Sequence, residues 1–190
     1  MLLSVDLEKV LAYIQSPKLI RDDTIVPDEF PECVDSTYRR GYDWLYRYER
    51  DIASFLEPWL KPYRYELIGE KGILCEALSN AFYHGHGKDP KRTIVLKVFL
   101  GERGLVVRVC DSGKGFNVRQ VFQSYRNKKM YYHTAGNGIH LMVSSKQFGI
   151  FYDAAGSAFH MLYTFDHAFE GLELAYPGQK PSDCCGGSNR

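Results

Sequence analysis

Hydrophobic and polar positions repeat at two periods along the chain, and each period predicts one kind of element. Apolar residues three and four positions apart are typical of an amphipathic helix, whereas strict alternation is typical of a strand. The helical period predicts helices at residues 5–15, from Asp35 or Ser36 to about Glu57, at 66–84, and from about Gly138 to Lys146. The alternating period predicts strands at residues 93–100, 105–110, 148–153 and 157–165.

Turn and loop residues separate these elements. Residues 101–104 should join the first two strands as a hairpin, and Ala155 with Gly156 should join the last two. Pro58 should end the long second helix. Residues 16–32 contain three prolines and should be extended or irregular, and residues 111–137 should form a loop. This order of elements predicts an α+β fold, with helices packed on one face of a mixed sheet.

The composition is that of an ordinary globular chain. Its 190 residues suit one domain, and 24 Lys and Arg against 23 Asp and Glu leave a net charge of +1. That balance gives no indication of a nucleic-acid or membrane surface. No apolar run approaches the roughly 20 residues that span a bilayer. The first residues do not resemble a secretory signal.

The five cysteines do not form a pattern of metal ligands or of disulfides. Their number is odd, and their spacing matches neither a zinc site nor a disulfide framework. We therefore expect a reducing, cytoplasmic compartment. Cys184 and Cys185 lie in a tail whose last 14 or so residues should be disordered. We assign this pair no function.

Nine aromatic residues crowd residues 38–65. Core and helix packing explains such a concentration, because aromatic side chains bury large apolar areas. A protein interface, such as one between two copies of the chain, is the alternative.

Glu76, Asn80 and His84 follow one another at intervals of four residues in the third predicted helix. Residues four apart share one helix face, so these three form a polar stripe. A carboxylate one turn from an amide oxygen suits a hard cation with a water molecule beside it. A solvated helix face is the alternative interpretation of this stripe.

Asp111, Gly113 and Gly115 follow the second predicted strand directly. The strand would place a carboxylate at its end, and glycine would let the chain approach a ligand closely. A carboxylate can accept a hydrogen bond from the exocyclic amine of adenine, which guanine lacks at that position. An ordinary turn capped by aspartate is the alternative interpretation.

Gly136, Asn137 and Gly138 precede the fourth predicted helix. Free backbone N–H groups at a helix start favour phosphate oxygens. Between Asp111 and Asp153 the chain has six Lys or Arg residues and no acid, which fits a lid over a polyphosphate. A solvated basic loop is the alternative.

Taken together, these three constellations resemble the boxes of the GHKL ATPase superfamily. Residues 76–85 match its N-box, E-x-x-x-N-A-x-x-H-G, residues 111–115 match D-x-G-x-G, and residues 136–138 match the following glycine box. The form of the N-box and the single small domain look most like the bacterial anti-sigma-factor serine kinases. The resemblance implies a two-layer α/β sandwich of the Bergerat type, with an ATP-binding domain at 35–166 between extensions at 1–34 and 167–190.

The resemblance also implies roles for individual residues. Glu76 would act as the base, Asn80 would hold Mg²⁺ and Asp111 would bind adenine. The remaining ATP-binding residues implied by the resemblance are Gly113, Gly115, Gly136, Asn137, Gly138 and Ser157. Two positions depart from the family pattern, since Ala135 replaces the first glycine of the glycine box and Ser157 replaces a common threonine.

His84 and His86 invite a metal interpretation because one residue separates them. No third ligand has a suitable local spacing, so we favour His84 as a hydrogen-bonding residue that ends its helix. We interpret His86 as a loop residue.

The function expected from this resemblance is an ATP- and Mg²⁺-dependent serine/threonine protein kinase. Its expected substrate is an anti-anti-sigma protein with a STAS domain, and a sigma factor is the alternate partner. A detached histidine kinase domain is disfavoured, because the first histidine of the chain is His84, inside the N-box. A nucleotide-sensing module without catalysis is the third possibility.

Overall fold

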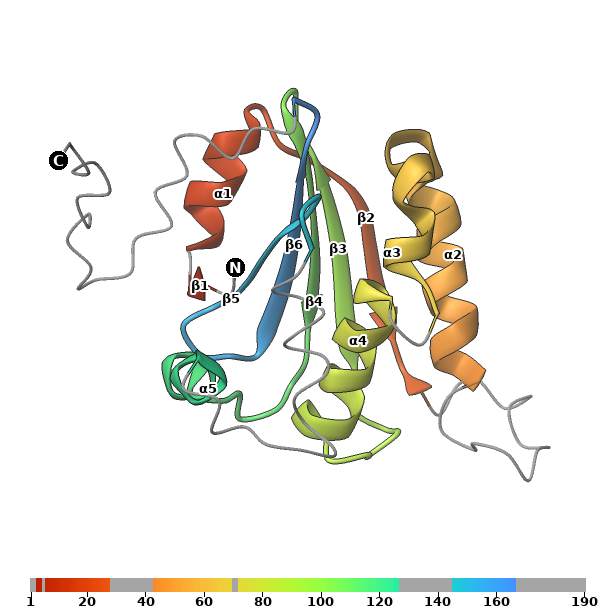
Figure 1. Cartoon of the computed structure of the whole chain (residues 1–190). Helices are drawn as coiled ribbons and strands as arrows, with labels where there is room; N and C mark the ends of the chain where they lie inside the picture. The colour runs from red at the N-terminus through yellow and green to blue at the C-terminus, as the bar shows by residue number, and fades with distance from the viewer. Residues whose placement is uncertain (1–2, 5, 28–42, 70–71, 127–144, 167–190) are drawn as a thin grey trace, which may run out of the picture.

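A six-stranded sheet forms the centre of the computed structural model, which describes residues 3–4, 6–27, 43–69, 72–126 and 145–166 (Figure 1). Its strands run in the order β1-β5-β6-β4-β3-β2. They are β1 (Leu3–Ser4), β5 (Gly149–Tyr152), β6 (Ala158–Thr164), β4 (Gly104–Cys110), β3 (Ile94–Leu100) and β2 (Lys18–Ile25). β1 pairs with β5 in parallel, and the other neighbours are antiparallel, so the prediction of a mixed sheet in an α+β fold is confirmed.

One face of the sheet is covered by the main helical layer. This layer contains α2 (Asp43–Leu60), the short turns η3 (Lys61–Tyr63) and α3 (Arg64–Leu67), α4 (Ile73–Asn80) and the π-helical turn η4 (Ala81–Gly85). Alternate residues of β3 and β4 point into the core beneath it, namely Ile94, Leu96, Val98, Leu105, Val107 and Val109. Leu56, Leu74 and Leu78 fill the helix side of this core. The amphipathic period of both helices is therefore explained by burial on the sheet.

The helix α1 (Leu7–Ile14) lies on the opposite face of the sheet (Figure 1). Asp6 caps it by accepting a hydrogen bond from the Glu8 N–H at 3.1 Å. Val10 and Ile14 are fully buried in a second core, which contains Val106 of β4. The sequence led us to expect helices on one face only. The structure adds α1 on the other face, because the outward side chains of β4, β5 and β6 are themselves apolar.

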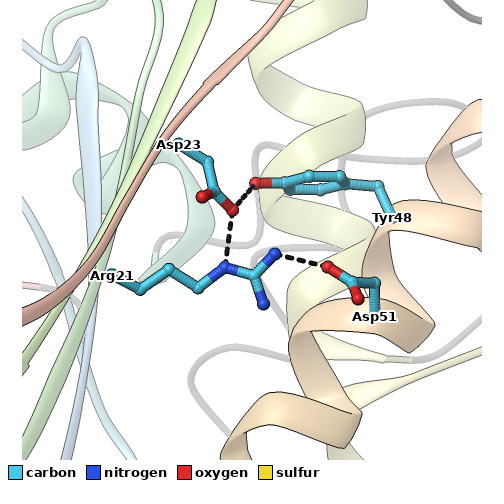
Figure 2. Close-up of polar contacts among 4 residues, drawn as sticks. All are labelled: Arg21, Asp23, Tyr48 and Asp51. Carbon is cyan, nitrogen blue, oxygen red and sulfur yellow. Dashed lines mark hydrogen bonds and ion pairs between the residues drawn. The ribbon is translucent and has the colours of Figure 1, made fainter.

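The strand β2 corrects the prediction of an irregular segment at residues 16–32. It pairs with β3 along its whole length, and a bulge between Leu19 and Arg21 interrupts the register. Two of its side chains toward the helices, Arg21 and Asp23, are polar, so the strand lacks the regular alternation of a half-buried strand, although Ile25 is buried in the main core. Figure 2 shows what replaces it: Arg21 bridges Asp23 and Asp51, and the Tyr48 hydroxyl donates to Asp23. These contacts tie the edge strand to α2 (Figure 2).

Two helix boundaries also differ from the predictions. α2 continues through Pro58 to Leu60, whose buried side chain stabilises the last turn. The helix predicted at 66–84 is broken after α3, where Gly69 has a φ of +90° and its N–H donates to Glu49 at 3.1 Å. A Cβ at Gly72 would collide with the Ile68 backbone, so the chain requires glycine to turn into α4.

The loop predicted at residues 111–137 contains a helix, α5 (Val118–Arg126), in its described part. Asn117 begins α5, because its side chain accepts a hydrogen bond from the Gln120 N–H at 3.0 Å. The helix predicted from Gly138 and the helix start predicted at Asp35 or Ser36 lie outside the described residues. In the described part of the chain, no helix is both long and apolar enough to cross a membrane.

Candidate functional site

The helix α4 presents Glu76 and Asn80 on the same face, as their spacing predicts. The Asn80 side-chain nitrogen donates a hydrogen bond to Glu76 Oε1 at 3.0 Å. Burial raises the pKa of Glu76 above its ordinary value, and the hydrogen bond from Asn80 opposes that change. The pair therefore combines a half-buried carboxylate with an amide whose carbonyl oxygen points away from it.

Tyr152 of β5 is a site residue that the sequence did not reveal. Its side chain is 8% exposed. Its ring packs edge-on against the rings of Phe116 and Phe159, with distances between ring centroids of 4.9 and 5.6 Å. Burial raises the pKa of Tyr152, and the negative charge of Glu76 raises it further, while a hydrogen bond with Asn80 lowers it. The tyrosine hydroxyl thus lies beside the α4 pair. In the sequence, Tyr152 resembles any aromatic residue of a buried strand.

Asp111 follows β4 and is held at its backbone and its side chain. Its N–H donates to the Ser157 carbonyl at 3.0 Å, and its Oδ1 accepts from the Gly113 N–H at 2.7 Å. Burial raises the pKa of Asp111, and the hydrogen bond from Gly113 opposes that change. The carboxylate packs against Gly85 so closely that a Cβ there would lie 2.5 Å from Oδ1. Asp111 is therefore placed at the end of the helical segment that carries Glu76 and Asn80.

The glycines after Asp111 have a structural requirement of their own. A Cβ at Gly113 would lie 2.7 Å from Asp111 Oδ1 and would collide with the Gly85 carbonyl. Gly115 has a φ of +67°, and a Cβ there would collide with the Ala155 carbonyl. The Phe116 N–H donates to that carbonyl at 3.1 Å. Both glycines let the loop lie against η4 on one side and the β5–β6 turn on the other.

His86 and Arg92 connect this loop to the end of η4. His86 is 4% exposed, and its Nε2 accepts a hydrogen bond from the Ser112 N–H at 3.2 Å. Arg92 donates to the carbonyls of Ser112 and Gly85. The sequence indicated His86 only as a loop residue, whereas the structure buries it. His84, one residue before the end of η4, is exposed.

The remaining predicted site residues fall into two groups. Ser157 directs its hydroxyl at Asp153 Oδ2 (3.4 Å) and its N–H at Asp153 Oδ1 (2.9 Å), which forms the β5–β6 turn. Gly136, Asn137 and Gly138 lie outside the described residues. Within the described ranges, no group of three His, Cys, Asp or Glu side chains is arranged to hold a metal ion. A metal ion here would need oxygen ligands from Asn80, from the phosphates of a bound nucleotide and from water.

The donor set of this site fits a nucleotide. A half-buried carboxylate, which can accept a hydrogen bond from the amine of a base, is held at the end of η4, because Gly85 and Gly113 have no Cβ to collide with it. Glu76 and Asn80 lie on the preceding helix, and carboxylate and amide oxygens are ligand types that Mg²⁺ takes. A base at one end and a metal-bound phosphate chain at the other would occupy both.

Comparison with known proteins agrees with this geometry. Residues 66–145 match the family model of the histidine kinase-like ATPase domain. The matched range contains the α4 pair, Asp111 and the segment 136–138, and it ends before Ser157. An anti-sigma F factor from Anoxybacillus flavithermus is 29% identical over 92 residues, which are 48% of this chain. The match spans 62% of that relative's length.

The family match, the relative and the α+β fold all point to the same class of protein. Residues 66–145 are similar to the histidine kinase-like ATPase domain, and the chain is similar over 92 residues to an anti-sigma F factor.

Proposed function

We propose that the chain is a cytoplasmic, ATP-dependent serine/threonine protein kinase that phosphorylates a regulatory partner, a STAS-domain protein of the anti-anti-sigma type. One observation carries the proposal: Asp111, from the end of β4, packs against Gly85 at the end of the segment that bears Glu76 and Asn80. The carboxylate that follows β4 and the polar pair on α4 come from separate parts of the chain, and this contact brings them to one site. The similarity to an anti-sigma F factor supports the choice of partner class.

Asp111 would recognise adenine. Its Oδ1 already accepts from the Gly113 N–H, so the carboxylate orientation is fixed before a ligand arrives. A fixed acceptor favours the base with an amine at that position, because a ligand without it leaves the buried carboxylate unpaired. This gives preference for ATP over GTP.

Asn80 would hold Mg²⁺ through its carbonyl oxygen. Its nitrogen faces Glu76, so the amide is oriented with the oxygen on the other side. Mg²⁺ prefers oxygen ligands in octahedral geometry and commonly completes its shell with phosphates and water. When bound, the cation would neutralise charge on the phosphate oxygens. Gly136, Asn137 and Gly138 would hold the phosphate chain through backbone N–H groups, and Ser157 would lie near the base.

Glu76 would take the proton of the attacking hydroxyl. A general base works best when its pKa lies near the operating pH, and burial raises the pKa of Glu76 in that direction. The hydrogen bond from Asn80 orients the carboxylate and keeps it a base. Phosphoryl transfer otherwise depends on positioning and electrostatics, so few other groups are required.

The test has two steps. Thermal unfolding with millimolar Mg-ATP should show a rise in the melting temperature, because a ligand specific to the native state stabilises it by about 2.7 kcal/mol at 100 times its Kd. Labelled ATP is then incubated with the protein and candidate STAS proteins, and phosphate on a Ser or Thr of one candidate supports the kinase. Binding of ATP and of a partner without transfer would instead establish a nucleotide sensor.

A further inference from the structure

His86 joins two segments that the proposed nucleotide site uses. Its buried ring accepts a hydrogen bond at Nε2 from the Ser112 N–H, and the Ser112 hydroxyl lies 3.3 Å from the same nitrogen. Ser112 directly follows Asp111 in the chain. His86 therefore fixes the backbone beside the carboxylate that would recognise adenine.

Arg92 makes a second connection between the same segments. One guanidinium nitrogen donates to the Ser112 carbonyl and another to the Gly85 carbonyl at 3.4 Å. Side chains from residues 86–92 thus bind both the N–H and the C=O of Ser112. Because irregular chain lacks the regular partners of a helix or sheet, such side-chain bonds decide its conformation.

We propose that His86 and Arg92 are positioning residues of the nucleotide site, which hold residues 111–113 against Gly85 and so set the selectivity for adenine. This inference rests on the proposed function. It goes beyond that function because neither residue belongs to the motifs that suggested an ATP site. Neither side chain needs to touch the nucleotide. Both act through Asp111.

The contact requires a neutral histidine. Nε2 can accept from the Ser112 N–H only when it carries no proton, so the neutral ring holds its proton on Nδ1. Burial lowers the pKa of His86 below 6.5, and Arg92 lowers it further, while Asp111 and Asp89 act in the opposite direction. The ring is therefore neutral at pH 7.5. Acid would remove the acceptor from Ser112 and place a positive charge beside Asp111.

Two substitutions of His86 separate its hydrogen bond from its bulk. His86→Gln keeps a neutral acceptor on a side chain of similar reach, whereas His86→Leu fills the space and leaves the Ser112 N–H unpaired. Calorimetry at pH 7.5 should show that His86→Leu weakens ATP binding at least fivefold or so. GTP binding should change less, because the lost feature is the orientation of Asp111. His86→Gln should restore most of the ATP affinity.

The dependence of ATP affinity on pH distinguishes a positioning role of His86 from a merely structural role, which would leave that dependence unchanged. The ATP affinity of the unmodified protein should fall as the pH is lowered from 7.5 through the pKa of His86, which lies below 6.5. In His86→Gln this part of the fall should be absent. Burial raises the pKa of Asp111 and His86 lowers it, so Asp111 also titrates and should gain its proton at a higher pH in His86→Gln. The fall of ATP affinity in His86→Gln therefore measures the contribution of Asp111 alone.

Arg92→Gln supplies an independent arm, with Arg103→Gln as its matched control. Arg103 pairs with Asp166 at the other end of β4, far from Asp111. Arg92→Gln should lower ATP affinity and narrow the preference over GTP, and Arg103→Gln should do neither. This arm keeps the test decisive where His86→Leu fails to fold.

The outcomes distinguish this inference from the function on which it rests. Wild-type affinity and selectivity in both His86→Leu and Arg92→Gln would overturn the positioning role and leave the ATP site intact. Equal losses for ATP and GTP in His86→Leu, together with the same fall of ATP affinity with pH in His86→Gln as in the unmodified protein, would also overturn it. An unmodified protein that binds no ATP would overturn the proposed function itself.

Discussion

Gly85 gives the sharpest test of the contact that carries the proposed function. An added methyl group at this position would lie 2.5 Å from Asp111 Oδ1 and 2.7 Å from Oδ2. Ordinary contact begins at 3.4 Å, so the carboxylate would have to move by about 1 Å. Gly85→Ala should therefore displace Asp111 without removing any functional group.

The expected magnitudes follow from packing and hydrogen bonding. Overpacking costs about 1–3 kcal/mol of folding stability, although alanine in a helical turn would otherwise stabilise the protein by up to about 1 kcal/mol over glycine. A displaced acceptor should cost ATP about 1–3 kcal/mol of binding free energy, which is roughly 5- to 150-fold in Kd. GTP should lose much less, because it never used that acceptor.

Gly87→Ala is the matched control. Gly87 lies two residues further along with a φ of +63°, and a Cβ there would meet nothing within 4 Å. The substitution should cost about 1–2 kcal/mol of folding stability through backbone strain alone. Urea unfolding measures both stabilities, and calorimetry with ATP and GTP measures both affinities.

The two variants should diverge in one respect only. Both should be destabilised, yet Gly85→Ala alone should lose its preference for ATP. An ATP preference unchanged in Gly85→Ala would show that Asp111 does not read the base. An equal loss of ATP affinity in Gly87→Ala would show that general destabilisation, and not the position of Asp111, sets the affinity.

Three further substitutions test the α4 pair and its tyrosine. Asn80→Ala should remove most of the Mg²⁺-dependent part of the thermal shift with ATP, and a shift equal to wild type would exclude Asn80 as a metal ligand. Tyr152→Phe removes only the hydroxyl beside Asn80, so it should weaken Mg-ATP binding several-fold, by about 1 kcal/mol, with the fold retained; calorimetry with and without Mg²⁺ checks this. Glu76→Gln should leave nucleotide affinity unchanged but lower single-turnover phosphotransfer by at least roughly 100-fold. Glu76→Gln should also raise the melting temperature at pH 7 to 8. The raised pKa of Glu76 means that the folded state favours the protonated acid. The contribution of Glu76 to folding stability is therefore present below pH 4.5 and is lost as the pH rises and the carboxylate ionises. Identical pH profiles of stability for the two proteins would contradict that reasoning.

The sequence was sufficient where one short segment contains both the pattern and its cause. The spacing of Glu76 and Asn80 predicts a shared helix face, and the structure joins them by a hydrogen bond. The alternation of β3 and β4 predicts a hairpin that delivers Asp111 to the end of a strand, and that strand is observed. In both cases local geometry alone fixes which side chains meet.

The sequence was insufficient where polar contacts replace hydrophobic alternation. Arg21 and Asp23 occupy inward positions of β2, and a pattern-based prediction expects apolar residues there. Their charges are tolerated because Arg21 bridges two carboxylates and lies 5.0 Å from the Phe55 ring centroid. Asp51 and Tyr48 complete the network, and they lie 30 residues after Arg21 and 25 residues after Asp23, respectively (Figure 2). No local signal marks such pairs.

Tyr152 and His86 are site residues that local sequence patterns could not predict either. Tyr152 lies 72 positions after Asn80 and reaches it only because β5 joins the sheet next to β6. His86 meets Ser112 across the whole β3–β4 hairpin. Motifs identify groups that face a ligand, since the ligand imposes their spacing. The residues that orient those ligand-facing groups come from distant parts of the chain. They can be identified only when the order of the strands in the sheet is known.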